Sequence, residues 1–262
     1  MIKASRRRWL AIGLVLALIA GFPSAAAAKH SWANYHWART SNSFTLLVGD
    51  NVSDTWDPYL GVAITNWTAS TVLDLARTDG QTNPESCPPT AGRIEACSAS
   101  YGDNGWLGLA QIWVRVTHIT QAVTKVNDTY FNTAPYNTPA WRHLVMCQEI
   151  AHDFGLDHQD EVFDNANLGS CMDYTADPDG KIADPDQLSN ERPNAHDYAQ
   201  LEKIYRHSDR TSTVGVAAAG APGNAPASWG QLVSGSQASG VSLYVLDLGN
   251  GQRVYTHVIW AR

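Results

Sequence analysis

Positive charge is scarce in this sequence of 262 residues. Lysine and arginine number 18 against 25 aspartate and glutamate residues, and charged residues make up only 16% of the chain. Four of the basic residues lie in the first eight positions, so 14 remain downstream against 25 acidic residues, a net charge of about −11. An acidic protein has no electrostatic basis for binding nucleic acid or anionic lipid. We therefore expect neither as a partner.

Long apolar runs are also missing, apart from one near the start. Basic residues at positions 3, 6, 7 and 8 precede an apolar run over residues 9–22, and four alanines follow at residues 25–28. This is the pattern of a secretory signal peptide (residues 1–28), cleaved after Ala28. A retained membrane anchor is the alternative, but the run is shorter than the ~20 residues that a bilayer requires. We expect a secreted, extracellular protein without membrane contact after cleavage.

Cysteine is limited to four residues, Cys87, Cys97, Cys147 and Cys171. In an exported protein an even number of cysteines indicates two disulfides, although four cysteines allow three pairings. We favour Cys87–Cys97, because this bridge would close a short proline-rich loop. Free buried thiols are the alternative.

Internal repeats are not visible, and the mature chain divides into a main part, residues 29–210, and a tail, residues 211–262. Apolar periodicity predicts strands at residues 44–48, 93–98, 106–116 and 118–127. It predicts helices from residue 54 or 55 to about 75, from 139 to 155, and over 195–205.

The tail begins with a change in composition. Residues 212–237 are dominated by alanine, glycine, serine and proline, which is typical of a flexible linker. Residues 242–260 contain two short strand patterns. They are too few for an independent domain, so we expect them to pack on the main part or to remain loose.

The informative motif is Gln-Glu-x-x-His-x-x-Gly-x-x-His, formed by Gln148, Glu149, His152, Gly155 and His158. Residues four apart on a helix project from one face, so Gln148 and His152 lie together. Gly155 permits a sharp turn that can return His158 to the same point. Three donors would then converge and leave a fourth position open for water, as a catalytic zinc site requires. Glu149 is placed to accept a proton from that water.

This segment resembles the signature of the metzincin metallopeptidases, His-Glu-x-x-His-x-x-Gly-x-x-His followed by a Met-turn. Met172, 14 residues after His158, matches the methionine of that turn. Tyr174 matches a position where astacin-like and serralysin-like members carry a metal-binding or transition-state-stabilising tyrosine; a core tyrosine is the alternative. The resemblance covers residues 35–207.

The resemblance implies an α+β fold with a twisted, mixed five-stranded sheet, an antiparallel edge strand, an active-site helix and a C-terminal helix. In this family the Met-turn lies against the active-site helix, which implies a Cys147–Cys171 bridge. Residues 106–111 would lie at the antiparallel edge, where an extended substrate could pair with the strand. An ordinary edge strand is the alternative.

Gln148 departs from the family pattern, because a histidine ligand normally occupies this position. An amide oxygen is a weaker donor for zinc than an imidazole, so metal affinity should fall. Tyr174 could compensate as an additional ligand. We also considered His118 as a replacement ligand, but a strand or surface histidine is the simpler interpretation.

Calcium is a second candidate ion. Four aspartates could supply the hard oxygen ligands that calcium prefers, although ordinary turn chemistry explains them as well. They are Asp177, Asp179, Asp184 and Asp186.

Together these features predict a secreted, zinc-dependent endopeptidase that hydrolyses peptide bonds through a metal-activated water. Glu149 would be the general base, and Gln148, His152 and His158 the zinc ligands. The alternative is a secreted, non-catalytic binding protein, a pseudopeptidase on the same fold. We expect a monomer whose partner is a peptide or protein substrate.

Overall fold

The computed structural model describes residues 31–32, 34–182, 184–215 and 222–262. The predicted signal peptide lies outside these residues. No helix in the described part is both long and apolar enough to cross a bilayer.

The described residues form one large sheet and a small set of helices. The helices are α1 (Asp57–Thr68), α2 (Asp128–Phe131), α3 (Pro139–His152) and α4 (Ala195–Ile204), with short 3-10 turns η1 (Pro226–Ser228) and η2 (Gln237–Ser239). The strands are β1 (His36–Trp37), β2 (Phe44–Asn51), β3 (Leu73–Asp79), β4 (Ile94–Ala99), β5 (Trp106–Arg115), β6 (His118–Asn127), β7 (Gln231–Ser236), β8 (Val241–Gly249) and β9 (Gln252–Trp260).

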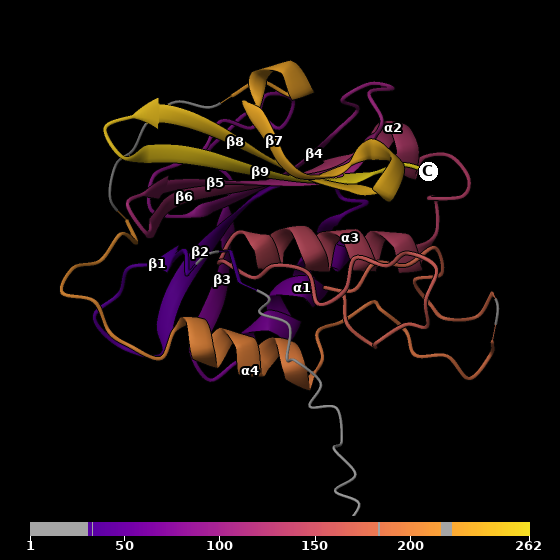
Figure 1. The fold of residues 1–262 in the computed structure, drawn as a ribbon, viewed down its shortest axis with the longest axis horizontal. Coiled ribbons are helices and arrows are strands. Elements are labelled where there is room, and N and C mark those ends of the chain that lie inside the picture. Colours follow the sequence, from indigo (N-terminus) through magenta and orange to yellow (C-terminus); the bar gives the residue numbers. More distant parts are fainter. Residues whose placement is uncertain (1–30, 33, 183, 216–221) are drawn as a thin grey trace, which may run out of the picture.

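The sheet has the order β3-β2-β4-β6-β5-β9-β8-β7, and the short β1 pairs with β6. Strands β2, β3, β4 and β6 are parallel, whereas β5 is antiparallel to β6. Helices α1, α3 and α4 lie on one side of the sheet (Figure 1). The mixed α+β architecture is confirmed, but the prediction of five strands is wrong. The described part of the sheet has nine strands, because the tail contributes β7, β8 and β9 and the short β1 is added beside β6.

Residues 106–111 are not at an edge of the sheet. Strand β9 pairs antiparallel along β5, from Trp106 opposite Trp260 to Arg115 opposite Gln252. Every residue of β5 except Arg115 is buried. The antiparallel edge of the described sheet is therefore β7, and the position predicted for an extended substrate is filled by the chain's own tail.

The helix predicted to reach residue 75 ends earlier, at Thr68. Leu73 and Leu75 are buried and flank the half-buried Asp74, which is the two-residue period of a strand. Residues 73–79 pair in parallel with β2. Here long-range strand pairing outweighs the local helical spacing of apolar residues.

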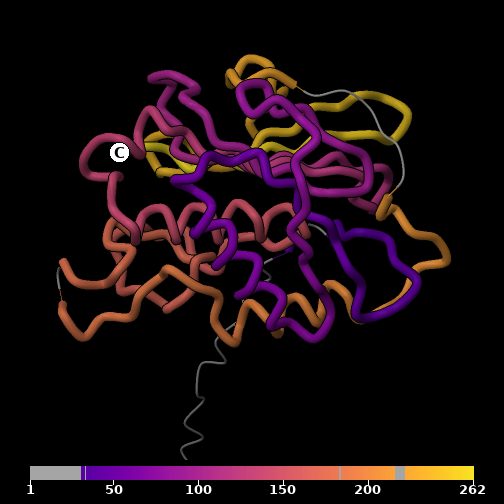
Figure 2. Tube along the Cα trace, turned by 180° about the vertical axis from the view of Figure 1, so that it is seen from behind, coloured from indigo at the N-terminus to yellow at the C-terminus, as the bar shows by residue number. Residues whose placement is uncertain are grey.

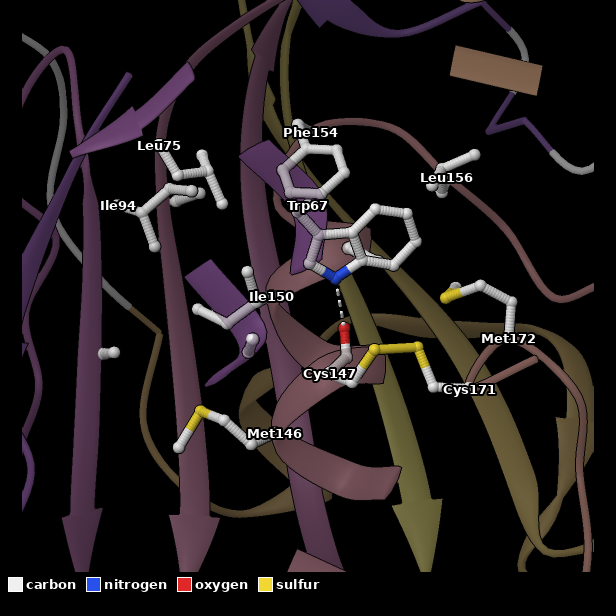
Figure 3. Packing of buried hydrophobic residues seen from close by; sticks show 14 of the residues in the cluster. Trp67, Leu75, Ile94, Met146, Cys147, Ile150, Phe154, Leu156, Cys171 and Met172 are labelled. Carbon is white, nitrogen blue, oxygen red and sulfur yellow. Dashed lines mark hydrogen bonds between the residues drawn. A yellow bond between two sulfur atoms is a disulfide. The ribbon is translucent and has the colours of Figure 1, made fainter. Parts of the chain in front are cut away.

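The hydrophobic core lies between the sheet and helices α1 and α3. Trp67 of α1 is fully buried and donates an indole hydrogen bond to the carbonyl of Cys147 on α3 at 3.0 Å (Figure 3). Cys147 is bonded to Cys171, and Cys87 to Cys97, so both disulfide predictions are confirmed. The first bridge fastens α3 to the segment that carries Met172 (Figure 3).

The tail is held at its far end as well as along β9. The C-terminus lies beside the loop that follows α2 (Figure 2), where the Tyr136 hydroxyl donates to the carbonyl of Arg262 at 2.7 Å. The guanidinium of Arg262 also stacks over the ring of Phe163, 4.3 Å from its centroid. These contacts hold the end of the chain that follows β9, the strand that faces α3.

Candidate metal centre

Helix α3 presents three of the predicted site residues. The Thr138 side chain caps its first turn by accepting from the backbone N–H of Trp141 at 3.3 Å, and Pro139 occupies a first-turn position. Gln148, Glu149 and His152 follow in the second half of the helix, and all three are buried. The helix ends at His152, three residues before Gly155.

Gly155 reverses the chain so that His158 returns to the helix. Its φ of +97° lies in the left-handed region that side chains avoid, and an added Cβ would lie 2.2 Å from the carbonyl oxygen of Tyr35. After this turn, Nε2 of His158 lies 3.1 Å from Nε2 of His152. The sequence spacing therefore predicts this convergence correctly.

Replacing Gly155 with alanine is expected to destabilise the fold by about 2–4 kcal/mol, because the positive φ and the Tyr35 clash add. Denaturant unfolding monitored by tryptophan fluorescence would measure this loss. Gly102→Ala is the matched control, since Gly102 has a φ of +91° but open space around its Cβ position. Equal losses in the two variants would show that the Tyr35 contact is unimportant.

A third histidine, His257 of β9, completes the cluster. The ligand atoms of His152, His158 and His257 all lie within 4.8 Å of one another. The ring of His257 is 4.0 Å from that of His152 and 4.3 Å from that of His158, measured between centroids. None of the three side chains is more than 6% exposed.

The sequence analysis did not identify His257 as a site residue. It lies in a strand 99 residues beyond His158, and no motif links the two. One signal was available: alternation in β9 places His257 on the same face as Tyr255 and Ile259, which are buried. A histidine at an inward position of an otherwise apolar strand face is unusual enough to indicate a site.

Two of the imidazoles are oriented by partners on their outer nitrogen. His152 Nδ1 lies 2.8 Å from the carbonyl of Leu156, and His158 Nδ1 lies 3.4 Å from a carboxylate oxygen of Glu161. Such partners fix the tautomer and leave Nε2 of each ring facing the centre, the arrangement usual for metal-binding histidines. The ring of Trp32 stacks on His152, with centroids 5.1 Å apart, and covers it from outside.

Gln148 also faces the cluster. Its amide nitrogen lies 2.6 Å from Nε2 of His158. Coordination would require a half-turn of the amide, which exchanges nitrogen for oxygen at almost the same place. Gln148 therefore lies next to the imidazoles, and rotation of its amide group would bring the oxygen, its ligand atom, to the same place.

Glu149 is completely buried, and its two carboxylate oxygens accept no hydrogen bond from any described residue. Burial raises the pKa of Glu149 well above its usual value, and the nearby carboxylate of Asp153 adds to the effect. Helix α3 approaches β5 closely at this point because β5 carries Gly108, where a Cβ would lie 3.0 Å from Cγ of Glu149. A buried carboxylate without partners is costly unless a cation or water satisfies it.

Tyr174 and Met172 are both brought to the centre. The ring of Tyr174 is 4.4 Å from that of His158, and burial raises its pKa well above its usual value. Met172 is fully buried, and its carbonyl accepts from the backbone of Gln159, immediately after His158. The segment around Met172 thus lies against the turn that carries the histidine.

Other predicted ligands lie elsewhere. His118 contacts Asp209, away from this centre. Asp177 accepts from the backbone N–H groups of Lys181 and Ile182, which is turn chemistry. None of the four aspartates considered for calcium belongs to a metal-capable cluster in the described ranges, so the structure offers no support for calcium.

The donors present fit a zinc ion. Nitrogen atoms bound at 2.0–2.1 Å to a tetrahedral ion lie about 3.4 Å apart, close to the 3.1 Å between His152 and His158. Three imidazoles and one amide would fill all four positions, as in closed sites.

No protein-family model matches the chain, and a comparison with curated protein sequences gives no match. Among solved structures, the chain is similar to high choriolytic enzyme 1, a hatching enzyme zinc-protease of Oryzias latipes (medaka fish). The two share 12% sequence identity with a TM-score of 0.36, over 69% of this chain and 98% of the other. A likeness this distant does not by itself identify a family or an activity.

Proposed function

We propose that this chain is a secreted, zinc-dependent endopeptidase whose centre is closed in the conformation described. The observation that carries the proposal is the convergence of three buried imidazoles, with the buried, unpartnered carboxylate of Glu149 on the same helix as His152. The two disulfides fit an exported protein, since such bonds persist in oxidising compartments.

Two ligand sets follow from the geometry. His152 and His158 belong to both, because each has its outer nitrogen occupied and its Nε2 directed inward. With β9 in place, His257 joins them and Gln148 fills the remaining position. With β9 displaced, Gln148, His152 and His158 hold the ion and leave one position open, as catalysis requires.

Strand β9 lies where an extended peptide would bind. A peptide can add to a free strand edge through backbone hydrogen bonds, and the edge of β5 that faces the centre is taken by β9. We infer that substrate takes the place of β9 on β5, and that the tail therefore keeps the enzyme latent.

The residues around the centre then have distinct tasks. A zinc ion held here would polarise the scissile carbonyl and increase the acidity of water. Glu149 would accept the proton of the attacking water and pass it to the leaving amine, a role suited to a carboxyl whose pKa is raised by burial. The hydroxyl of Tyr174 would donate a hydrogen bond to the oxygen that gains negative charge.

A non-catalytic binding protein is the second candidate, and one observation favours it. All four donors and Glu149 are buried, so the centre as described has no surface for a substrate. A cavity of about 770 Å³ adjoins Trp32, Tyr35 and Asp157, but the ring of Trp32 separates it from His152. In this reading the metal would only stabilise the fold.

The proposal is tested by incubating the mature, oxidised protein with a mixed peptide library and reading new termini by mass spectrometry. We expect cleavage with stoichiometric zinc and its loss when a chelator removes the metal, because the proposed mechanism needs the metal to polarise the carbonyl. Partial proteolysis of the tail before the assay should increase the yield. Absence of new termini in both the intact and the tail-cleaved, zinc-loaded protein would favour the binding protein.

A further inference from the structure

A second cluster of metal-ligating side chains lies away from the centre described above. It combines His36 of β1, His118 at the start of β6, and His207 and Asp209 in the segment after α4. The sequence spreads these residues over more than 170 positions, and pairing of β1 with β6 opposite His118 brings the first two together. The proposed peptidase activity makes no use of them.

The distances between the donor atoms match the edges of one tetrahedron. Oδ1 of Asp209 lies 3.5 Å from His36 Nε2, 3.3 Å from His118 Nε2 and 3.5 Å from His207 Nε2. His207 Nε2 lies 3.2 Å from His36 Nε2. Ligand atoms 2.0–2.1 Å from a tetrahedral zinc ion are separated by about 3.4 Å. These four distances bring donor atoms from three separate parts of the chain close enough to share one ion.

The orientation of His36 supports coordination. Its Nδ1 lies 2.7 Å from the carbonyl of Asn34, so Nε2 is the nitrogen that faces the cluster. Asn34 adopts a φ of +76°, a backbone state that asparagine tolerates better than most residues. His36 is buried, so its ring is held in place by the surrounding side chains.

The carboxylate of Asp209 contacts an arginine as well as the histidines. Oδ2 accepts from the guanidinium of Arg39 at 3.0 Å and from the backbone N–H of Arg39 at 3.2 Å. Oδ1 lies within 3.5 Å of Nε2 of all three histidines, and Oδ2 is also 3.4 Å from Nε2 of His36. One charged imidazole would be enough to form an ion pair with this carboxylate. Three positively charged rings around it would repel one another. Three imidazole nitrogens within 3.5 Å of one carboxylate are better explained by a cation between them.

We propose that His36, His118, His207 and Asp209 form a second metal site for a divalent transition metal, with zinc as the best match. Three imidazoles and one carboxylate complete a tetrahedral set with no open position, so the site is structural. The metal would fasten β1 and the segment after α4 to the start of β6. Half of the His207 side chain and a third of the His118 side chain are exposed, which gives an ion access.

Zinc stoichiometry of the full-length mature protein tests this proposal. The protein is stripped with a chelator, reloaded with zinc and gel-filtered, and metal per chain is measured by inductively coupled plasma mass spectrometry. We expect the unmodified chain to retain two ions, and His118→Ala/His207→Ala to retain one. The variant should also lose part of the rise in Tm that zinc produces. His152→Ala/His158→Ala should retain the other ion, so the two sites are distinguished.

The matched control is His143→Ala/His196→Ala, which removes two half-buried histidines outside both clusters and should retain two ions. His118→Gln/His207→Gln keeps most of the side-chain volume and separates loss of ligands from loss of packing. Equal zinc content and equal Tm rise in the unmodified chain and in either His118/His207 variant would overturn the second site. A single ion that depends only on His118 and His207 would support it and contradict the central site.

Discussion

Replacing Glu149 with glutamine is expected to lower kcat/KM for peptide cleavage by about 1,000-fold, within the range that general acid–base catalysis contributes. Glutamine keeps the size of the side chain but cannot accept the proton of the attacking water. Metal content should not change, because Glu149 is not in either proposed ligand set. Initial rates with a peptide from the library, together with zinc content, measure both effects.

Stability provides the control for this variant. Glu149 is fully buried with neither carboxylate oxygen hydrogen-bonded to a described residue, so a neutral amide should leave the Tm unchanged or raise it. Loss of activity at an unchanged Tm would then reflect chemistry rather than unfolding. If Glu149→Gln cleaved at the rate of the unmodified enzyme, Glu149 would not be the base. If neither the unmodified protein nor Glu149→Gln cleaved peptide while zinc stayed bound, the non-catalytic binding protein would be the better explanation.

Fastening β9 to β5 by a disulfide is expected to reduce peptide cleavage by more than about 100-fold, because the population with a free β5 edge would become negligible. Gln111 and Thr256 are opposite each other in these strands, and their side chains are hydrogen-bonded at 3.0 Å. Gln111→Cys/Thr256→Cys would place the bridge at this pair, where antiparallel geometry suits a disulfide. Side chains alternate along β9, so the bridge lies on the face opposite His257.

The register of the sheet offers a matched control. Thr256 also lies opposite Tyr244 of β8. Tyr244→Cys/Thr256→Cys would therefore fasten β9 to β8 and leave both strands free to move away from β5 together. We expect this second variant to keep the activity of the unmodified chain. Full activity of the β5–β9 cross-linked protein would show that β9 need not move. The cavity next to Trp32 would then be the candidate entrance for the substrate.

The local part of the centre could be predicted from the sequence because helix geometry and one glycine determine it. Gln148, Glu149 and His152 share a helix, and the turn at Gly155 returns His158, so spacing alone carries the information. The disulfide to Cys171 followed from the family resemblance, and it holds the segment of Met172 close to α3.

The tail could not be placed in the same way. Strand pairing joins residues that are distant in sequence, and the pattern of β9 specifies a buried face without specifying its neighbour. For this reason the five-stranded prediction omitted β7, β8 and β9, and the ligand set omitted His257. The same limit explains the second cluster. His118 was considered only as a replacement ligand for the central zinc, because nothing in the sequence indicates its contact with Asp209.

The pairing of β5 with β9 also bears on how the molecule folds. Its contacts join residues up to 154 positions apart, as between Trp106 and Trp260, and such non-local pairings form slowly. β9 is the last element of the described chain and emerges after every other strand during synthesis. Until it docks, β5 presents an unpaired apolar edge, a template for association with another chain. We therefore expect the species without docked β9 to be the one that aggregates. The yield of refolding should depend on how quickly β9 pairs with β5.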